Sequence, residues 1–161
     1  MGNFTWSYSG LSLFKQCPRK FYRTRISRDT KEEEQDFLLY GKAVHTAAEE
    51  YGRDNIDLPA QYEFIKPYVD TLMRTGGDKY YELKMALTAD LEPCGFSDPE
   101  AWWRGIADFM AVDGKTALLV DYKTGKSTRY ADTKQLEILS LALFKHFPEV
   151  KTVKGGLMFV V

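Results

Sequence analysis

The segment LLVDYKTGKST, residues 118–128, contains two groups of residues that could carry chemistry. Asp121 and Lys123 follow an apolar run, which is typical of a metal-dependent phosphodiesterase site on a strand. Gly125-Lys126-Ser127 instead resembles the end of a phosphate-binding loop. Such a loop requires a glycine at the position of Val120, inside the apolar run. We therefore disfavour nucleotide binding and interpret Gly125-Lys126-Ser127 as a turn that leaves a strand.

A second carboxylate, that of Asp108, is expected close to Asp121. The intervening Asp-Gly-Lys sequence is a strong hairpin signal. If residues 114–115 form the turn, Asp108 pairs with Asp121. If residues 113–114 form it, Asp108 faces Leu119 and lies diagonal to Asp121. Both registers bring the two carboxylates together.

Two like charges side by side on a sheet repel each other, and a divalent cation would offset that repulsion. Mg²⁺ prefers one or two carboxylates, keeps several waters and takes further ligands from substrate phosphates. A metal held by Asp108 and Asp121 would activate water, and Lys123 would orient that water or stabilise the transition state. The alternative is a surface hairpin whose exposed acids are balanced by Lys115 and Lys123.

Further motifs occur along the chain in a fixed order, and the hairpin motifs take their place among them. They are SGLSLFKQCPRKF from residue 9, GKAVH from residue 41, RGIAD from residue 104, VDYKTG from residue 120 and QL from residue 135. Together they closely resemble the RecB-like branch of the PD-(D/E)XK nuclease superfamily, from about Ser7 to Val161. That branch includes nuclease domains of bacterial recombination enzymes, CRISPR-associated adaptation nucleases and small phage exonucleases.

The resemblance implies a role for each motif residue. It implies a Mg²⁺ or Mn²⁺ site whose ligands are His45, Asp108, Asp121 and the backbone carbonyl of Tyr122. It also implies that Lys123 is the catalytic lysine. Two accessory residues are implied more loosely, Glu82 and Gln135. Taken alone, His45 is more typical of a histidine on a helix surface or in a core than of a metal ligand, and Glu82 is more typical of an ordinary strand residue. Gln135 also fits a capping box begun by Asp132.

The chain departs from the family pattern at two places. Leu139 stands where the helix begun by Gln135 usually carries a tyrosine, which removes one expected substrate or active-site contact. Iron–sulfur members of the branch need four cysteines, whereas this chain has two, Cys17 and Cys94. An iron–sulfur cluster is therefore not expected.

A basic run near the N-terminus is the candidate DNA contact, because the net charge of −1 provides no global positive excess. Aromatic residues are interleaved with its cations, which are Lys15, Arg19, Lys20, Arg23, Arg25 and Arg28. The first five are the candidate DNA-binding residues. The alternative is a solvated helix face whose aromatic residues enter the core. Trp102 and Trp103 adjoin the hairpin on opposite faces; one is expected in the core, and the other could stack on a base.

Hydrophobic periodicity predicts the elements that must position these residues. Helices are expected from Ser7 or Ser9 with a break near Pro18, and over 37–53, 58–74 and 132–147. Strands are expected over 80–88, 101–112, 116–123 and 156–161. This order predicts an α/β fold, which the resemblance makes a restriction-endonuclease-like mixed β-sheet core flanked by helices. We expect one nuclease-like domain over 1–161, and the apolar ending is compatible with a natural chain that continues.

Composition and motifs together lead to one predicted function and one alternative. No apolar run approaches the ~18 residues of a membrane span, and the N-terminus lacks a signal-peptide layout, so we expect a cytoplasmic protein. The predicted function is a Mg²⁺- or Mn²⁺-dependent DNA exonuclease that hydrolyses phosphodiesters in DNA processing, repair or recombination. A protein partner in a recombination or phage DNA-processing complex would fit this role. The alternative is a non-catalytic DNA- or partner-binding module that keeps the nuclease fold.

Overall fold

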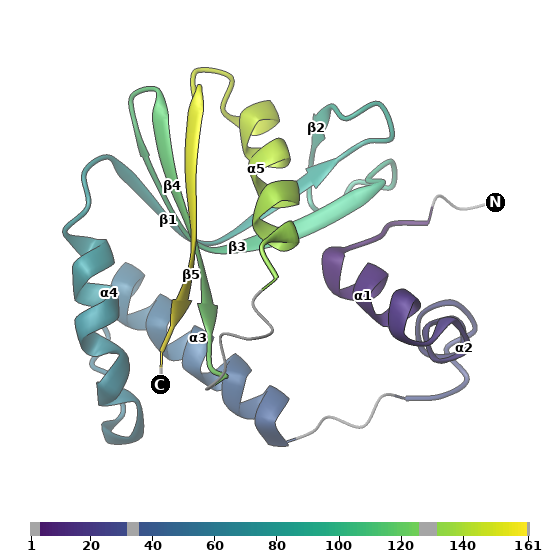
Figure 1. The fold of residues 1–161 in the computed structure, drawn as a ribbon, viewed down its shortest axis with the longest axis horizontal. Coiled ribbons are helices and arrows are strands. Elements are labelled where there is room, and N and C mark those ends of the chain that lie inside the picture. The colour runs from purple at the N-terminus through teal and green to yellow at the C-terminus, as the bar shows by residue number, and fades with distance from the viewer. Residues whose placement is uncertain (1–3, 32–35, 126–131, 161) are drawn as a thin grey trace.

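The computed structural model describes residues 4–31, 36–125 and 132–160 of the 161-residue chain. Residues 126–128, the end of the segment that resembles a phosphate-binding loop, lie outside the described ranges. The helices are α1 (Tyr8–Gln16), α2 (Pro18–Phe21), the π-helix Tyr22–Ile26, α3 (Asp36–Asp54), the 3₁₀-helix Ala60–Ile65, α4 (Lys66–Met73) and α5 (Lys134–His146). The strands are β1 (Asp78–Leu87), β2 (Pro93–Cys94), β3 (Trp103–Asp113), β4 (Thr116–Lys123) and β5 (Thr152–Phe159). Figure 1 shows their arrangement.

The strands form one five-stranded mixed sheet in the order β2-β1-β3-β4-β5. Neighbours pair antiparallel except β4 and β5, which pair parallel. Parallel neighbours need a crossover, and α5 provides it between β4 and β5. The predicted α/β fold, a mixed sheet flanked by helices, is therefore confirmed.

Helices cover both faces of the sheet, and each face has its own apolar cluster. The cluster under α5 includes Met85, Trp103, Met110, Leu119, Leu136, Leu139 and Leu143. The cluster under α3 and α4 includes Val44, Ile65, Val69, Leu72, Phe109, Val120 and Tyr122. Met110 and Phe109 lie on opposite faces because successive side chains of a strand alternate.

The β3–β4 hairpin has the first of the two expected registers. Phe109 pairs with Val120 and Asp113 with Thr116, which leaves residues 114–115 as the turn. Gly114 has φ 57°, a left-handed conformation that glycine adopts without strain. Extrapolated by one residue, this register places Asp108 opposite Asp121.

At that point β3 and β4 separate, and we call this place the fork. No β3–β4 pair is formed beyond Phe109 and Val120 in the described residues, whereas β4 continues along β5 as far as Lys123 and Phe159. On the other side, β3 continues along β1 as far as Trp103. Figure 1 shows β1 and β3 turning away together while β4 and β5 run on. The sheet therefore opens where the two predicted acids lie.

A break in strand alternation on β1 coincides with the fork. Glu82, which falls opposite Asp108 in the β1–β3 register, has φ 47° and forms no ladder pair. Tyr81 packs on the α3 side, but Leu83 packs on the α5 side, although a regular strand would place them on the same face. The paired strand β3 changes side at the same place, from Phe109 to Ala107, so both strands turn over where Glu82 and Asp108 lie.

Most expected elements occur near their predicted positions, and the exceptions have physical causes. The single helix expected over 58–74 is divided into the 3₁₀-helix Ala60–Ile65 and α4, because Pro67 lacks an amide hydrogen and favours the start of a helix. The two-residue β2 was missed, and β5 begins earlier than expected, since Gly155 and Gly156 masked its strand character. Among the described residues, no helix combines the length and apolar character that crossing a bilayer requires.

Candidate active site

Three elements bring acidic and imidazole groups together beside the fork. His45 extends from α3, Glu82 from the left-handed position of β1, and Asp108 from β3. His45 Nδ1 lies 3.3 Å from Asp108 Oδ1 and 3.9 Å from Glu82 Oε1. One ligand atom from each residue lies within 4.8 Å of the others. This spacing lets a single ion contact all three.

The two hairpin carboxylates are buried rather than exposed. Asp108 is 9% exposed and Asp121 is 4% exposed. The Tyr122 backbone N–H donates a hydrogen bond to Asp108 Oδ2 at 2.7 Å. The Asp108 carboxylate therefore accepts a hydrogen bond from a β4 amide that lies beyond the last β3–β4 backbone pair. The alternative interpretation, a surface hairpin with exposed acids, is wrong because both acids lie in the interior.

Lys123 and Asp121 share one face of β4, as alternate residues of a strand do, and their side chains also form an ion pair. Its Nζ is 2.5 Å from Asp121 Oδ2, and its side chain is 34% exposed. Asp121 is not among the three residues whose ligand atoms cluster within 4.8 Å. The lysine therefore balances the buried carboxylate while keeping contact with solvent.

The electrostatics of the cluster follow from burial and crowded acids. Burial and the charge of Asp108 raise the pKa of Glu82 to about 7. Burial and the same neighbour also raise the pKa of Asp121, partly offset by Lys123. Burial lowers the pKa of His45, but a hydrogen bond to Asp108 and the surrounding acids outweigh it, and the net pKa is raised. Protons are therefore held tightly where too many negative charges converge.

This donor set fits a divalent cation. Carboxylate oxygens and an imidazole nitrogen are ligands that such cations accept, and buried acids that retain protons need a positive charge to ionise together. The Tyr122 ring meets the His45 ring edge-on, with centroids 5.7 Å apart, and this contact restricts the imidazole. The backbone of α3 passes close to the residue that follows β4, since a Cβ at Gly41 would lie 3.2 Å from Thr124 Oγ1. His45 is therefore held toward the acids by packing as well as by charge.

The accessory residues lie in two different places. Glu82 joins the cluster, whereas Gln135 lines a cleft that also contains Asp108 and Leu139. The capping box, the alternative role for Gln135, does not form: the N-cap of α5 is Thr133, and Asp132 Oδ1 accepts from the Lys134 amide. Leu139 is 2% exposed and packs in the α5-side core. The position at which the family usually carries a tyrosine is thus used for packing here.

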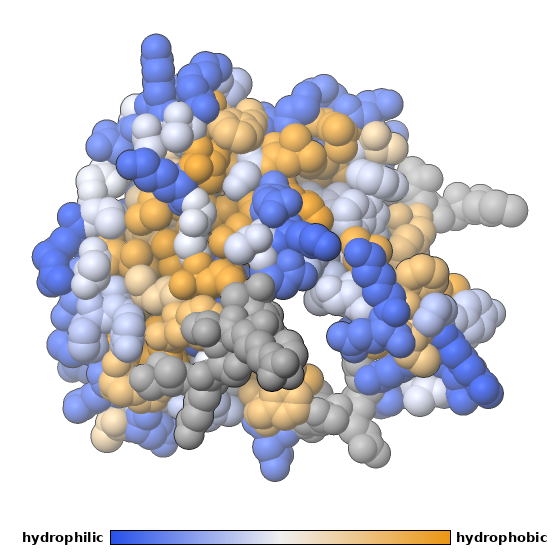
Figure 2. All heavy atoms as spheres, viewed as in Figure 1, coloured by the Kyte–Doolittle hydropathy of each residue, from blue (hydrophilic) through white to orange (hydrophobic). Residues whose placement is uncertain are grey.

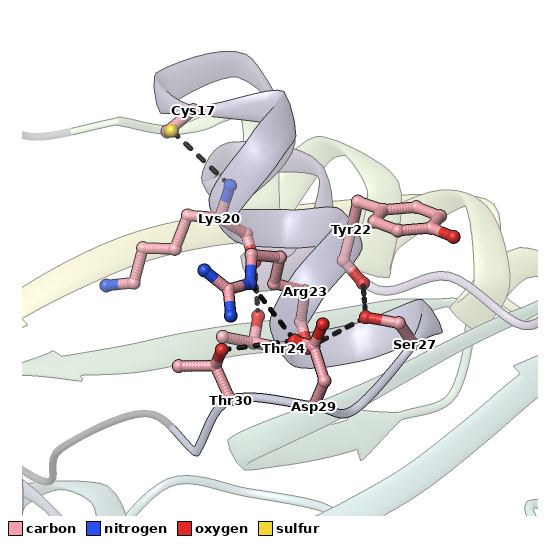
Figure 3. A network of polar contacts seen from close by, with 8 residues as sticks. All are labelled: Cys17, Lys20, Tyr22, Arg23, Thr24, Ser27, Asp29 and Thr30. Carbon is pink, nitrogen blue, oxygen red and sulfur yellow. Dashed lines mark hydrogen bonds and ion pairs between the residues drawn. The ribbon is translucent and has the colours of Figure 1, made fainter.

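The basic run follows α1, α2 and the π-helix, and its five cations are exposed: Lys15, Arg19, Lys20, Arg23 and Arg25. Asp29 forms an ion pair with Arg23 Nε at 3.1 Å and accepts a hydrogen bond from Thr30 (Figure 3). Cys17 Sγ accepts from the Lys20 amide at the start of α2. The interleaved aromatics divide between roles, because Phe21 packs edge-on against Phe14 whereas Tyr22 is 57% exposed. Of the two tryptophans, Trp103 is in the core and Trp102 is 38% exposed, as expected.

The motifs and the fold agree with a comparison to known protein families. The sequence pattern of the PD-(D/E)XK nuclease superfamily matches residues 5–160. The chain belongs to the PD-(D/E)XK nuclease superfamily. Members of this superfamily use divalent metals, and the cluster of His45, Glu82 and Asp108 is a possible site for one in this nuclease-like chain. Comparison with curated proteins finds no significant match.

Two features of the nuclease-like site had no clear signal in the sequence. One is the left-handed conformation of Glu82, since glutamate within an apparently regular strand gives no indication of a turn. The other is the wall that the N-terminal segment adds at the fork: the Trp6 amide donates to Trp102 O, and the Arg104 amide donates to Trp6 O, both at 3.0 Å. Trp6 lies before the first expected helix, where periodicity makes no prediction.

Proposed function

We propose that the protein is a DNA exonuclease of the RecB-like branch, dependent on Mg²⁺ or Mn²⁺, that hydrolyses phosphodiester bonds in DNA processing, repair or recombination. The observation that carries the proposal is the convergence of His45, Glu82 and Asp108 beside the ion pair of Asp121 and Lys123. The order of motifs along the chain supports the branch, and we propose that residues 1–161 act as one nuclease domain, of which residues 5–160 match the superfamily pattern.

In this proposal the acids and the histidine hold the cation, and Lys123 acts on the substrate. His45, Glu82, Asp108 and Asp121 are the proposed ligands, together with the Tyr122 carbonyl. A bound divalent cation supplies a Lewis acid and lowers the pKa of a water molecule. The Lys123 ammonium orients the attacking water or stabilises charge that develops on the phosphate. The Tyr122 amide fixes the Asp108 carboxylate through its 2.7 Å hydrogen bond.

The exposed cations of the first three helices are the proposed DNA-binding residues: Lys15, Arg19, Lys20, Arg23 and Arg25. Interactions of basic side chains with phosphates give affinity without sequence preference. That behaviour suits an enzyme that degrades DNA of any sequence. We further propose that the enzyme acts in the cytoplasm, within a recombination or phage DNA-processing complex.

The test is cleavage of end-labelled linear DNA and of circular DNA, with Mg²⁺, Mn²⁺ or a chelator. The expected result is loss of label from linear DNA with either metal, no cleavage with chelator, and survival of circular DNA. Cleavage of circular DNA would replace the exonuclease with an endonuclease. No cleavage with any metal would favour the non-catalytic DNA- or partner-binding module.

A further inference from the structure

A cleft leads from Asp108 toward the N-terminal helices. It consists of two adjoining hollows, with volumes of about 500 and 660 Å³. Asp108 and Gln135 lie in the first hollow, and Arg25 and Arg28 lie in the second. The two hollows share lining residues, including Trp6, Ser7 and Arg104. A continuous path therefore joins the candidate active site to the basic helices.

The two walls of the cleft are held together by backbone pairing. Trp6 forms a parallel bridge with Trp103 on the edge of β3 that β4 leaves free at the fork. The amide of Trp6 and that of Arg104 each make a 3.0 Å hydrogen bond across this edge. Figure 2 shows the surface hollowed between the N-terminal helices and the α5 side of the sheet, which provide the two walls. The N-terminal wall of the cleft is thus fixed to β3 by backbone hydrogen bonds.

Its chemistry changes along its length. Asp108 is the one acidic group among the described residues that line the two hollows, and it lies at the active-site end. Arg104 lies four residues before it on β3, about 13 Å away at roughly 3.3 Å per residue. The far end contains Arg25 and Arg28, and aromatic side chains line the whole path, including Trp6, Phe21 and Phe96. Cations interleaved with aromatic rings characterise sites for unpaired nucleic-acid strands.

The dimensions favour one strand over two. Each hollow has a volume typical of a site for one small molecule, so it holds a nucleotide or two. A duplex, whose major groove alone is about 12 Å wide, is larger than either hollow.

Two nitrogen atoms on the shared wall lack acceptors within the described residues. Trp6 Nε1 and Arg104 Nε are both buried without a hydrogen-bond partner there. Arg104 is already oriented, because its Nη2 donates to Asp98 O at 3.1 Å and its guanidinium lies 5.6 Å from the centre of the Phe96 ring. Buried donors without partners are rare and require an explanation. Phosphate oxygens are acceptors that suit a guanidinium.

We infer that the cleft binds a single strand of nucleic acid and leads it to Asp108, with phosphates contacting Arg104 and Arg28 and bases stacking on Trp6. The inference deepens the proposed function and rests on it. It adds Trp6, Arg28 and Arg104 to the residues that contact substrate, and it makes an unpaired end the form that reaches the site.

The test is direct binding in the presence of a chelator, which separates it from cleavage. Fluorescence anisotropy would give the Kd of a labelled oligothymidylate and of a hairpin duplex over a series of salt concentrations. The variants are Arg104→Gln and Arg28→Gln, with Arg74→Gln as the control. Arg74 follows α4, on the opposite side of the molecule from α1 (Figure 1), and the control removes the same charge.

Each cleft variant should weaken single-strand binding roughly tenfold, the loss expected for one charge-assisted contact. The slope of log K against log salt should fall by about 0.7 for each variant, and the control should change neither quantity. Circular dichroism checks folding, and Arg28, which is exposed, keeps the test valid should Arg104→Gln disturb the wall.

Equal Kd and slope in both cleft variants and the control would overturn the inference. Binding of the duplex as tightly as the single strand would also overturn it. A wild-type protein that binds the strand through Arg28 and Arg104 but cleaves nothing with any metal would overturn the proposed function and leave the cleft assignment intact.

Discussion

The two ends of the β3–β4 hairpin have the same pair of strands but opposite properties. From Asp113–Thr116 to Phe109–Val120 every residue pairs in register, and the central side chains are apolar and buried. One residue further, Asp108 and Asp121 are also buried but carry carboxyl groups, and the strands separate. Burial therefore stabilises the fold at one end and opposes ionisation at the other.

This difference shows how the fold accommodates a costly site. Buried like charges and a left-handed glutamate are unfavourable by themselves, and they persist because regular pairing and two apolar clusters hold the surrounding strands. Such local conflicts concentrate where a structure carries function. Substitutions of buried apolar residues in the paired part of the hairpin should affect stability, and substitutions of the acids at the fork should affect activity.

The largest effect on activity is expected for Asp121→Asn at the fork. We expect DNA cleavage to fall by about three orders of magnitude, the upper effect of removing one electrostatic group from an active site. The free energy of unfolding of the metal-free protein should not fall, because a neutral amide avoids the burial of charge and the repulsion from Asp108 that together raise the pKa of Asp121 despite Lys123. Cleavage rates and urea unfolding would measure both effects.

The matched control is Asp113→Asn, which makes the same change at the exposed turn end of the same hairpin. It should leave the cleavage rate and the stability unchanged. An Asp121→Asn protein that cleaves DNA at the wild-type rate would remove Asp121 from the site.

Phe109→Ala, in the last regular β3–β4 pair before the fork, should instead affect stability. Phe109 is fully buried and packs edge-on against Tyr81, with ring centroids 5.3 Å apart. Its loss should cost about 3–5 kcal/mol of unfolding free energy, measured by urea denaturation.

Phe37→Ala is the comparison for Phe109→Ala, because Phe37 is 65% exposed on α3; it should change stability by less than about 0.5 kcal/mol. Equal losses in the two variants would contradict the placement of Phe109 in the core.

The same contrast explains what the sequence could predict. The Gly114 turn and alternating apolar residues predicted β4 to the residue and allowed two hairpin registers, one of which occurs. Turn chemistry and alternation are local properties, so they can be recognised in the sequence. Both registers placed Asp108 near Asp121, and for that reason the prediction did not depend on choosing between them.

What could not be predicted depends on distant parts of the chain. Past the fork β4 pairs with β5 alone, and further along β3 Trp6 bridges to Trp103; each pairing joins segments far apart in sequence. The resemblance suggested Glu82 as an accessory acid, but only the left-handed backbone places it beside His45. Its role as a ligand remains a prediction.

The stability of the protein and its stabilisation by metal should both depend on pH through the residues at the fork. Glu82 has a pKa of about 7 in the folded protein against an ordinary value of 4.5. In the metal-free protein its contribution to stability is therefore full below about pH 4.5 and is lost as pH rises through about 7. Metal binding requires the deprotonated ligands, so metal-induced stabilisation should instead grow as pH rises through the same range.

Calorimetric melting with and without Mn²⁺ over a range of pH would measure both the metal-free stability and the stabilisation by metal. At about 100-fold excess over Kd, metal should add roughly 2.7 kcal/mol above pH 7 and less near pH 5. In Glu82→Gln the metal-free loss of stability with rising pH should be smaller. A metal effect that is constant with pH would contradict the assignment of protonated groups as ligands.

The smallest expected effect isolates the backbone cost of the fork. Glu82→Gly and Glu82→Ala both remove the carboxylate, but only glycine adopts φ 47° without strain. The glycine variant should be more stable than the alanine variant by about 1 kcal/mol, measured by urea denaturation of metal-free protein. Both should lose metal affinity equally, because the lost ligand is the same. Equal stabilities would mean that residue 82 stores no strain, and the separation of β3 from β4 would then need only the buried acids to explain it.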